Sequence, residues 1–200
     1  MTSEKYTGSA ERWSREQYAD SATYLRRRAE LIVPGLERGD TILDLACGDG
    51  GLADFLPGLE YRGVDLNEAM VAAARRHGVQ AEVADLNEYV PSTPVAATTV
   101  FRAIYYARDR AAFFAHVASY TRRRLVFDLN PRQYDVADVL DDLAAAGFTG
   151  VTLRPFFVPQ RVSLPAPAAA LARSLERSGP LARAILRARF TYIVAASAPS

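Results

Sequence analysis

The stretch TILDLACGDGGLADFL combines one carboxylate with a run of very small residues. Asp44 interrupts an apolar segment, and Ala46, Cys47, Gly48 and Gly50 follow it. Glycine lacks a side chain and tolerates a positive φ, so a turn of this kind lets a ligand approach the main chain closely. The stretch therefore predicts a ligand site built from backbone groups, with a carboxylate beside it.

Two further carboxylates close other apolar segments. Asp65 ends YRGVD, 21 residues after Asp44, and Asp85 ends EVAD. In a strand–helix–strand unit that binds a nucleoside, a carboxylate at the end of the second strand can accept hydrogen bonds from the ribose hydroxyls. The competing explanations are an N-cap of the next helix for Asp65 and a surface turn for Asp85.

Strands that alternate with helices must position these residues. Such an order predicts a mostly parallel sheet that helices cover on both faces. Ligands of open sheets of this class bind beyond the carboxyl ends of the strands, where the three aspartates stand. The expected strands are 41–45, 61–64, 80–83, 98–104, 124–129, 151–158 and 190–196. The expected helices are 14–36, 50–55, 67–77, 111–120, 136–146 and a segment near 168–188.

Composition limits the class of protein. The chain has 200 residues, half of them hydrophobic, and a formal net charge of +1. This balance gives no electrostatic reason to bind nucleic acid or an anionic membrane. Cys47 is the single cysteine, which fits a reducing compartment, and the start of the chain has no signal-peptide pattern. We expect a cytoplasmic protein, and the preference for arginine over lysine (Lys5 alone) suggests a GC-rich, bacterial coding bias.

The pattern Asp44-x-Ala46-x-Gly48-x-Gly50 resembles motif I of the class I S-adenosylmethionine-dependent methyltransferases, in the variant with alanine for the first glycine. It does not match the dinucleotide pattern G-x-G-x-x-G. The resemblance covers about residues 36–160 and 190–197. It implies an α/β, Rossmann-like, seven-stranded sheet whose last strand is antiparallel. We expect this S-adenosylmethionine-binding domain at 36–200, with a helical insertion near 165–189 and an N-terminal helical cap at 1–35.

The resemblance also assigns positions to the cofactor S-adenosylmethionine. Asp44 would meet the methionine amino group, Asp65 the ribose and Asp85 the adenine amino group. Small residues after the first strand would form a backbone wall, and Gly50 would let the next helix begin close to the cofactor. The cofactor-binding residues expected are Asp44, Ala46, Cys47, Gly48, Gly50, Asp65, Leu66, Asp85, Leu86, Arg102 and Tyr24.

The acceptor side is predicted from the ends of the fourth and fifth strands. Tyr105 and Tyr106 follow the fourth strand and would line the reaction chamber, although core packing is an equal alternative. Arg132 follows the fifth strand and could hold a carboxylate or phosphate of the acceptor, or belong to a helix-start turn. Aromatic residues of the N-terminal segment suit a sulfonium and flat acceptors. These are Tyr6, Trp13, Tyr18 and Tyr24.

Candidates for a general base are few. His77 fits a helix C-terminus, His116 a packed position and Asp109 a helix N-cap better than catalysis. Asp128 and Asn130 could suggest a divalent metal, but the sequence shows no obvious companion carboxylate, and we expect no metal.

The sequence thus favours an enzyme that methylates the oxygen or nitrogen of a small molecule, by in-line transfer in which positioning dominates. We expect a role in specialised metabolism, and a monomer or homodimer. A non-catalytic S-adenosylmethionine-binding or scaffold protein is the main alternative. A nicotinamide-dependent oxidoreductase is a third reading, against which the glycine spacing argues.

Overall fold

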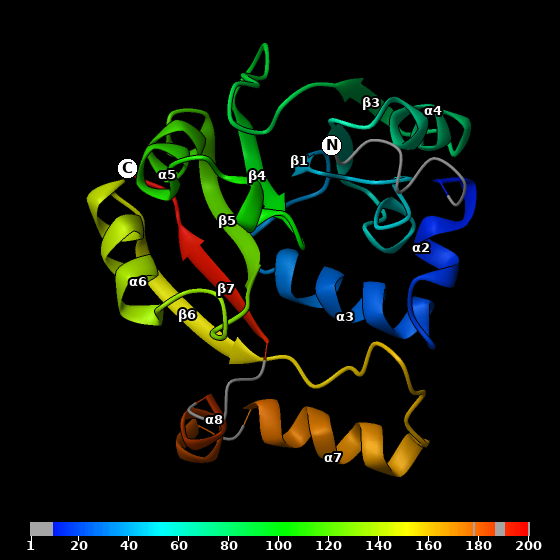
Figure 1. The fold of residues 1–200 in the computed structure, drawn as a ribbon, viewed down its shortest axis with the longest axis vertical. Helices are drawn as coiled ribbons and strands as arrows, with labels where there is room; N and C mark the ends of the chain where they lie inside the picture. Colours follow the sequence, from blue (N-terminus) through cyan, green and yellow to red (C-terminus); the bar gives the residue numbers. More distant parts are fainter. Residues whose placement is uncertain (1–9, 178, 187–190, 200) are drawn as a thin grey trace.

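The computed structural model describes residues 10–177, 179–186 and 191–199. Within these residues, seven strands form one sheet in the order β3-β2-β1-β4-β5-β7-β6 (Figure 1). β7 is antiparallel to both of its neighbours, whereas the other neighbouring pairs are parallel. The strands are β1 (Thr41–Leu45), β2 (Glu60–Asp65), β3 (Gln80–Val83), β4 (Val95–Val100), β5 (Thr121–Leu129), β6 (Thr149–Pro155) and β7 (Tyr192–Ser197). The predicted Rossmann-like sheet with a reversed last strand is confirmed.

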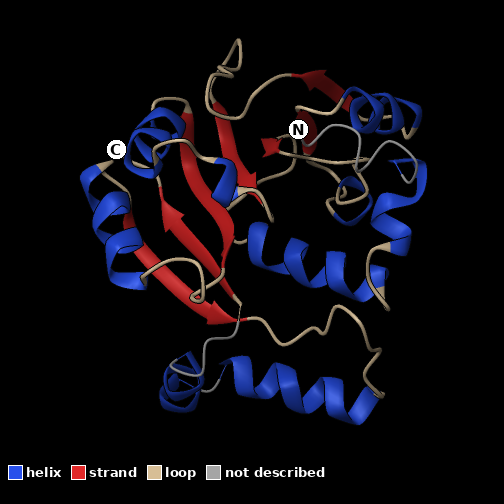
Figure 2. Cartoon of the chain, in the orientation of Figure 1, coloured by secondary structure: helices blue, strands red, loops and turns tan. Residues whose placement is uncertain are grey.

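Helices cover both faces of this sheet (Figure 2). Alternate strand residues point to opposite faces: Leu43 and Leu45 join the core beneath α5 and α6, whereas Ile42 joins the core beneath α3. Helix α4 packs over β2 and β3 on the α3 side. The helices are α2 (Trp13–Glu16), α3 (Ser21–Ile32), α4 (Glu68–Arg76), α5 (Arg110–Ala118), α6 (Val136–Ala145), α7 (Ala166–Arg177) and α8 (Gly179–Leu186), with short 3₁₀ turns η1 (Ala10–Arg12), η2 (Ala53–Phe55) and η3 (Ile104–Tyr106).

Capping residues fix where helices begin. Asn67 accepts hydrogen bonds from two amides of the first turn of α4, and Asp109 and Asp135 do the same for one amide each of α5 and α6. Each satisfies donors that a helix start leaves without partners. Asp109 therefore acts as the N-cap that the sequence favoured for it.

Three predicted elements differ from the structure. The N-terminal helix expected over 14–36 is two helices, because the Asp20 side chain accepts from the Thr23 amide and starts α3 afresh. The helix expected over 50–55 is a turn followed by η2. The fourth strand stops at Val100, since Arg102 turns to a φ of +56°.

The segment between β6 and β7 carries α7 and α8, which lie beyond the ends of these strands and below α3 in Figure 1. Glu176 of α7 and Arg27 of α3 form a buried ion pair. The other Glu176 carboxylate oxygen accepts a hydrogen bond from the Phe157 amide, 2.9 Å away. The insertion is therefore fastened to the N-terminal helix; its predicted start near 165 agrees with α7, and the division into two domains stays a proposal.

Candidate functional site

A cavity of about 300 Å³ lies beyond the carboxyl ends of the central strands. Its walls come from the segments that follow β1, β2, β3 and β4, and its cover comes from α2 and α3. Eleven of the residues that the sequence predicted line it: Asp44, Ala46, Cys47, Gly48, Asp65, Leu66, Asp85, Leu86, Arg102, Tyr105 and Tyr106.

Backbone strain gathers at this cavity. Among the described residues that are not glycine, a positive φ occurs at Ala46, with +66°, and at Arg102, with +56°. Such residues are uncommon, and they concentrate at functional sites. One follows β1 and the other follows β4, its neighbour in the sheet. The Arg102 turn is held by Asp128, whose carboxylate accepts the Arg102 amide at 2.6 Å.

The glycine turn after β1 is packed from two sides. A Cβ on Gly48 would lie 3.1 Å from the Cδ1 atom of Trp13, which covers the turn. A Cβ on Gly63 of β2 would lie 2.5 Å from the sulfur of Cys47, which leaves no space below the turn. Burial raises the pKa of the Cys47 thiol well above its usual value. Cys47 is thus a small wall residue and an unreactive thiol.

Asp44 is the most deeply buried carboxylate of the cavity, with 4% of its surface exposed. The Thr99 hydroxyl donates to one oxygen at 2.7 Å, and the Tyr61 hydroxyl donates to the other. Burial nevertheless raises the pKa of Asp44 to about 6. A cation beside Asp44 would favour its ionised form.

Asp65 and Asp85 are held by backbone amides. Asp65 accepts from the amides of Gly48 and Asn67, both at 2.9 Å, and burial raises its pKa. The N-cap of α4 is Asn67, so capping does not account for Asp65. For Asp85, burial alone would raise the pKa, but hydrogen bonds from Asn87 and Arg108 outweigh it and leave the pKa lowered.

The N-terminal segment is latched over the turn. The amide and the hydroxyl of Ser14 both donate to the same oxygen of Asp49, each at 2.9 Å. Trp13 and Tyr18 line the cavity beside this latch, whereas Tyr6 lies outside the described residues. Aromatic residues therefore cover the cavity from the N-terminal side, as the sequence predicted for this segment.

Comparison with known proteins agrees with this geometry. Residues 42–124 match the family model described as a methyltransferase domain. This match spans the strained turn after β1 and all three aspartates. Residues 42–124 are thus similar to the methyltransferase domain, which supports the class I S-adenosylmethionine-dependent methyltransferase family that the sequence resembles. S-adenosylmethionine is the cofactor of this family.

Individual relatives of this chain are more distant. Trans-aconitate 2-methyltransferase of Mycobacterium tuberculosis is 39% identical over 61 residues, which cover 28% of this chain and 23% of the relative. A chain from the Haloferax volcanii complex between the Trm112 methyltransferase activator and a methyltransferase has a TM-score of 0.71 and 18% identity, covering 100% and 98% of the two chains. Magnesium protoporphyrin IX methyltransferase of Synechocystis PCC 6803 has a TM-score of 0.62 and 16% identity, covering 89% and 81%. The two solved structures share the fold.

Three predicted site residues lie outside the cavity lining. Gly50 faces α4, where a Cβ would lie 2.9 Å from the Val79 side chain, so packing requires this glycine. Tyr24 is buried behind Tyr18, with ring centroids 3.8 Å apart. Arg132 is exposed, and its amide donates to the Asn130 side chain in the turn that leads to α6. These three residues do not line the cavity, and their roles at the site stay predictions.

The sequence analysis also missed a buried charge pair at the cavity. Arg28 lines the cavity from α3 with 5% of its surface exposed. One guanidinium nitrogen lies 3.2 Å from the Asp128 carboxylate and 3.3 Å from the Tyr24 hydroxyl. The sequence signal for Arg28 was its spacing: it lies four residues after Tyr24 and four before Ile32, which places it on the apolar face of the helix.

Both histidines lie outside the cavity lining. His77 Nε2 is 2.9 Å from Asp54, and His116 Nε2 is 2.9 Å from the carbonyl of Tyr89. Within the described ranges, the structure holds no cluster of three or more histidine, cysteine or acidic residues that could bind a metal. The same ranges hold no helix that is both long and apolar enough to cross a membrane.

Proposed function

We propose that this chain transfers a methyl group from S-adenosylmethionine to the oxygen or nitrogen of a small molecule. The observation that carries the proposal is the convergence of a strained backbone turn and three aspartates, from three successive strand ends, on one cavity. About 300 Å³ is within the range of small-molecule sites, roughly 300–1,000 Å³. Because the curated relatives are matched over less than a quarter of their length, activity and acceptor are inferred from the cavity.

The residues present fit the cofactor by chemistry. Asp44 would accept from the ammonium of the methionine part, Asp65 from the ribose hydroxyls, and Asp85 from the adenine amino group. Each of these carboxylates is anchored by other groups of the chain and keeps lone pairs toward the cavity. The amide-rich turn at Ala46 and Gly48 suits close backbone contact. When bound, the cofactor supplies a methyl group on an electron-poor sulfonium, which aromatic faces stabilise.

The acceptor would lie toward Tyr105 and Tyr106. These two rings are 43% and 40% exposed, their centroids are 4.3 Å apart, and both residues line the cavity. Within the described part of the lining, the aspartates are the side chains that can accept a proton as carboxylates, and each is already held by other groups of the chain. We infer that the chain works mainly by holding the acceptor in line with the methyl group, which can supply much of the rate.

The class of acceptor stays open within small molecules. Relatives named for trans-aconitate make this compound one of the acceptors to screen. A second candidate function is cofactor binding that needs a partner for turnover, since one neighbour of the same fold was solved in complex with an activator. We favour the first, because the exposed rings beside the cavity leave room for a small acceptor in a single chain.

Calorimetry with S-adenosylhomocysteine and NADH tests the proposal. We expect the former to bind and the latter not to bind. A screen for methylated products with isotopically labelled S-adenosylmethionine then separates an enzyme from a binding protein. Binding of NADH in place of S-adenosylhomocysteine would contradict the function proposed, and cofactor binding without any product in the screen would favour the second candidate.

A further inference from the structure

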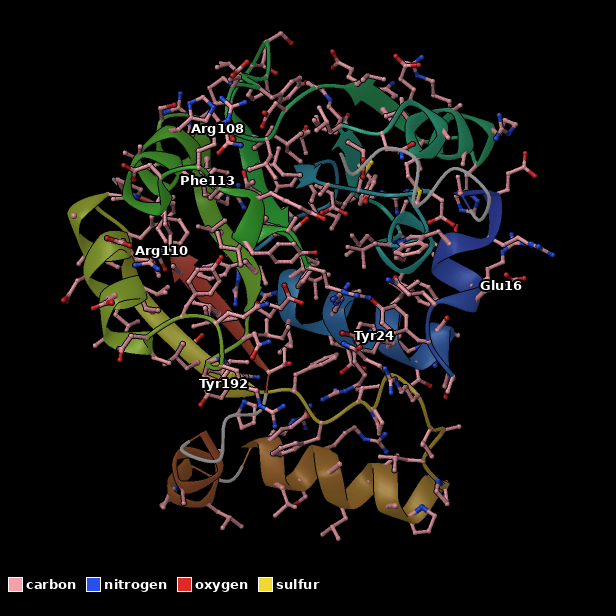
Figure 3. All side chains as sticks on the ribbon, in the orientation of Figure 1. Glu16, Tyr24, Arg108, Arg110, Phe113 and Tyr192 are labelled. Carbon is pink, nitrogen blue, oxygen red and sulfur yellow. The ribbon has the colours of Figure 1, made fainter. Side chains whose placement is uncertain are left out.

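Two adjoining hollows lie between α3 and α7, away from the cavity described above. In Figure 1, α7 lies below α3, and the segment that follows β6 runs between the two helices. Side chains of both helices reach into this space (Figure 3). Among the described residues, the two hollows share Arg27 and Arg173, and neither shares a residue with the cavity lining. They therefore form one region with two parts, separate from the site of the proposed function.

The first part is an apolar hollow of about 290 Å³. Its size is close to the lower end of the range for small-molecule sites, about 300 Å³. The segment after β6 and one face of α7 supply its apolar lining, which includes Phe157, Val158, Leu164, Ala169 and Ala172. Val162 lines the same hollow and is 62% exposed. A hollow with this lining suits the hydrocarbon part of a small ligand.

The second part is a groove with an excess of positive charge. Within the described lining, Arg27, Arg173 and Arg177 face the carboxylate of Glu30 alone. Glu30 is paired with Arg27, which also pairs with the buried Glu176. In the described part of the chain, no carboxylate lies within ion-pair distance of Arg173 or Arg177. These two guanidinium groups can therefore bind an added anion.

The spacing of Arg173 and Arg177 places both on one face of α7. They lie four residues apart and both are exposed. Like charges at this spacing repel one another and weaken a helix. A favourable interaction with the negative end of the helix accounts for Arg177, which lies in the last turn, but not for Arg173, one turn earlier. An anion held between the two side chains would remove their repulsion.

Arg27 lies at the junction of the two parts, because it lines both. It is 6% exposed, and its Nε atom has no hydrogen-bond partner among the described residues. A buried ion pair such as that of Arg27 with Glu176 is weak evidence for stability alone, since apolar packing can stabilise as well. A charged junction with unfilled space on both sides indicates that α3 and α7 are held apart with room for a ligand.

We propose that this region binds a small amphipathic carboxylate. Its hydrocarbon part would lie in the apolar hollow, and its carboxylate would lie at Arg173 and Arg177, whose planar guanidinium groups suit such an anion. A single negative charge is favoured over two, because Glu30 and Glu176 line the same region and would repel the second. The proposal is independent of the function proposed above, since none of these residues lines the cavity.

Octanoate, octanamide and acetate are matched probes for the two parts of the site. We expect octanoate to bind the full chain in ligand-observed NMR titrations. Octanamide, which lacks the charge, and acetate, which lacks the hydrocarbon part, should each bind at least about tenfold more weakly. Saturation with S-adenosylhomocysteine should leave octanoate binding unchanged, because the two sites share no described residue.

Substitutions then assign the two parts. The double variant Arg173→Gln with Arg177→Gln should weaken octanoate about tenfold and octanamide less than about twofold. Arg38→Gln with Arg122→Gln is the matched control, since it removes the same charge from two exposed arginines outside both hollows. Ala169→Leu should fill the apolar hollow and weaken octanoate and octanamide alike. If Ala169→Leu disturbs α7, the arginine variants still test the proposal.

The proposal is overturned if octanamide binds as tightly as octanoate, or if the control pair weakens octanoate as much as the α7 pair. Displacement of octanoate by S-adenosylhomocysteine would place the probe in the cavity and would also overturn it. Binding to phosphatidylglycerol vesicles without binding to monomeric octanoate would overturn it in favour of a membrane surface. Failure of the chain to bind S-adenosylhomocysteine would contradict the proposed function and leave this test in force.

Discussion

Asp44 gives cofactor binding an expected dependence on pH. Burial sets its pKa at about 6, although hydrogen bonds from Thr99 and Tyr61 favour the carboxylate. Compared with an ordinary aspartate at 3.8, ionising this side chain inside the fold costs about 3 kcal/mol. An ammonium placed beside Asp44 would offset this cost, so the protein binds the cofactor best when Asp44 is ionised.

Thermodynamic linkage to the ionisation of Asp44 gives the sign and the size of the expected pH effects. The folded pKa lies above the unfolded value, so the contribution of Asp44 to stability is fully present below about pH 4 and is lost as the pH rises to about 6. Binding of the cofactor ammonium has the opposite pH dependence, because it needs the ionised form of Asp44. With a pKa of about 6, the ionised fraction rises about tenfold between pH 5 and pH 7. We expect the affinity for S-adenosylhomocysteine to rise by the same factor.

Calorimetry of S-adenosylhomocysteine at pH 5, 6 and 7 measures this rise, with Asp44→Asn as the comparison. The variant should bind more weakly at pH 7 and lose most of the slope. His77 and His116 lie outside the cavity lining and are present in both proteins, so the comparison cancels any effect of these side chains. Burial also raises the pKa of Asp65, and the comparison isolates Asp44 from it. An equal slope in both proteins, or none in the wild type, would refute the reasoning.

Other substitutions test the site and its supports. Asp65→Ala should weaken the binding of S-adenosylhomocysteine by about 1–3 kcal/mol, the range for losing hydrogen bonds to a charged group. An unchanged calorimetric affinity would exclude Asp65 as a ribose ligand. Gly50→Ala should lower the free energy of unfolding by about 1–3 kcal/mol in urea titrations, because the new Cβ would meet Val79 and φ is +74°; unaltered stability would contradict that packing. Glu176→Gln should lower the free energy of unfolding by about 3 kcal/mol, since it removes the buried carboxylate that pairs with Arg27 and leaves that guanidinium only the more exposed Glu30; a smaller loss than that of the exposed pair variant Glu16→Gln would show that α7 is not fastened in this way.

The local parts of the site were predictable because each lies in one short stretch. The Asp44 turn and the strand ends at Asp65 and Asp85 read directly as small and acidic residues after apolar segments. Parallel strands align their carboxyl ends, so these residues lie together at one edge of the sheet. Asp20 is of a residue type that commonly caps helices, and it marks the start of α3. The apolar residues on both sides of it keep a helical spacing, so the sequence pattern predicted one continuous helix.

The direction in which a residue faces was not predictable from its position in a turn. Gly48 faces the N-terminal cover, whereas Gly50, two residues later, faces α4. Tyr24 carries the right chemistry but stands behind Tyr18, because the stacking of the two rings leaves only one in contact with the cavity. Such outcomes depend on neighbours that are distant along the chain.

The sequence by itself determined the alternation of strands with helices and the aspartates that close the strands, because periodicity and turn chemistry act over a few residues. The reversed last strand followed from the resemblance to a known family. Only the tertiary structure decided that Arg28 meets Asp128, which is 100 residues away. A buried charge pair of this kind forms only when two separate elements exclude water from both groups together. This charge pair therefore belongs to the packing of α3 on the sheet, and not to any single motif.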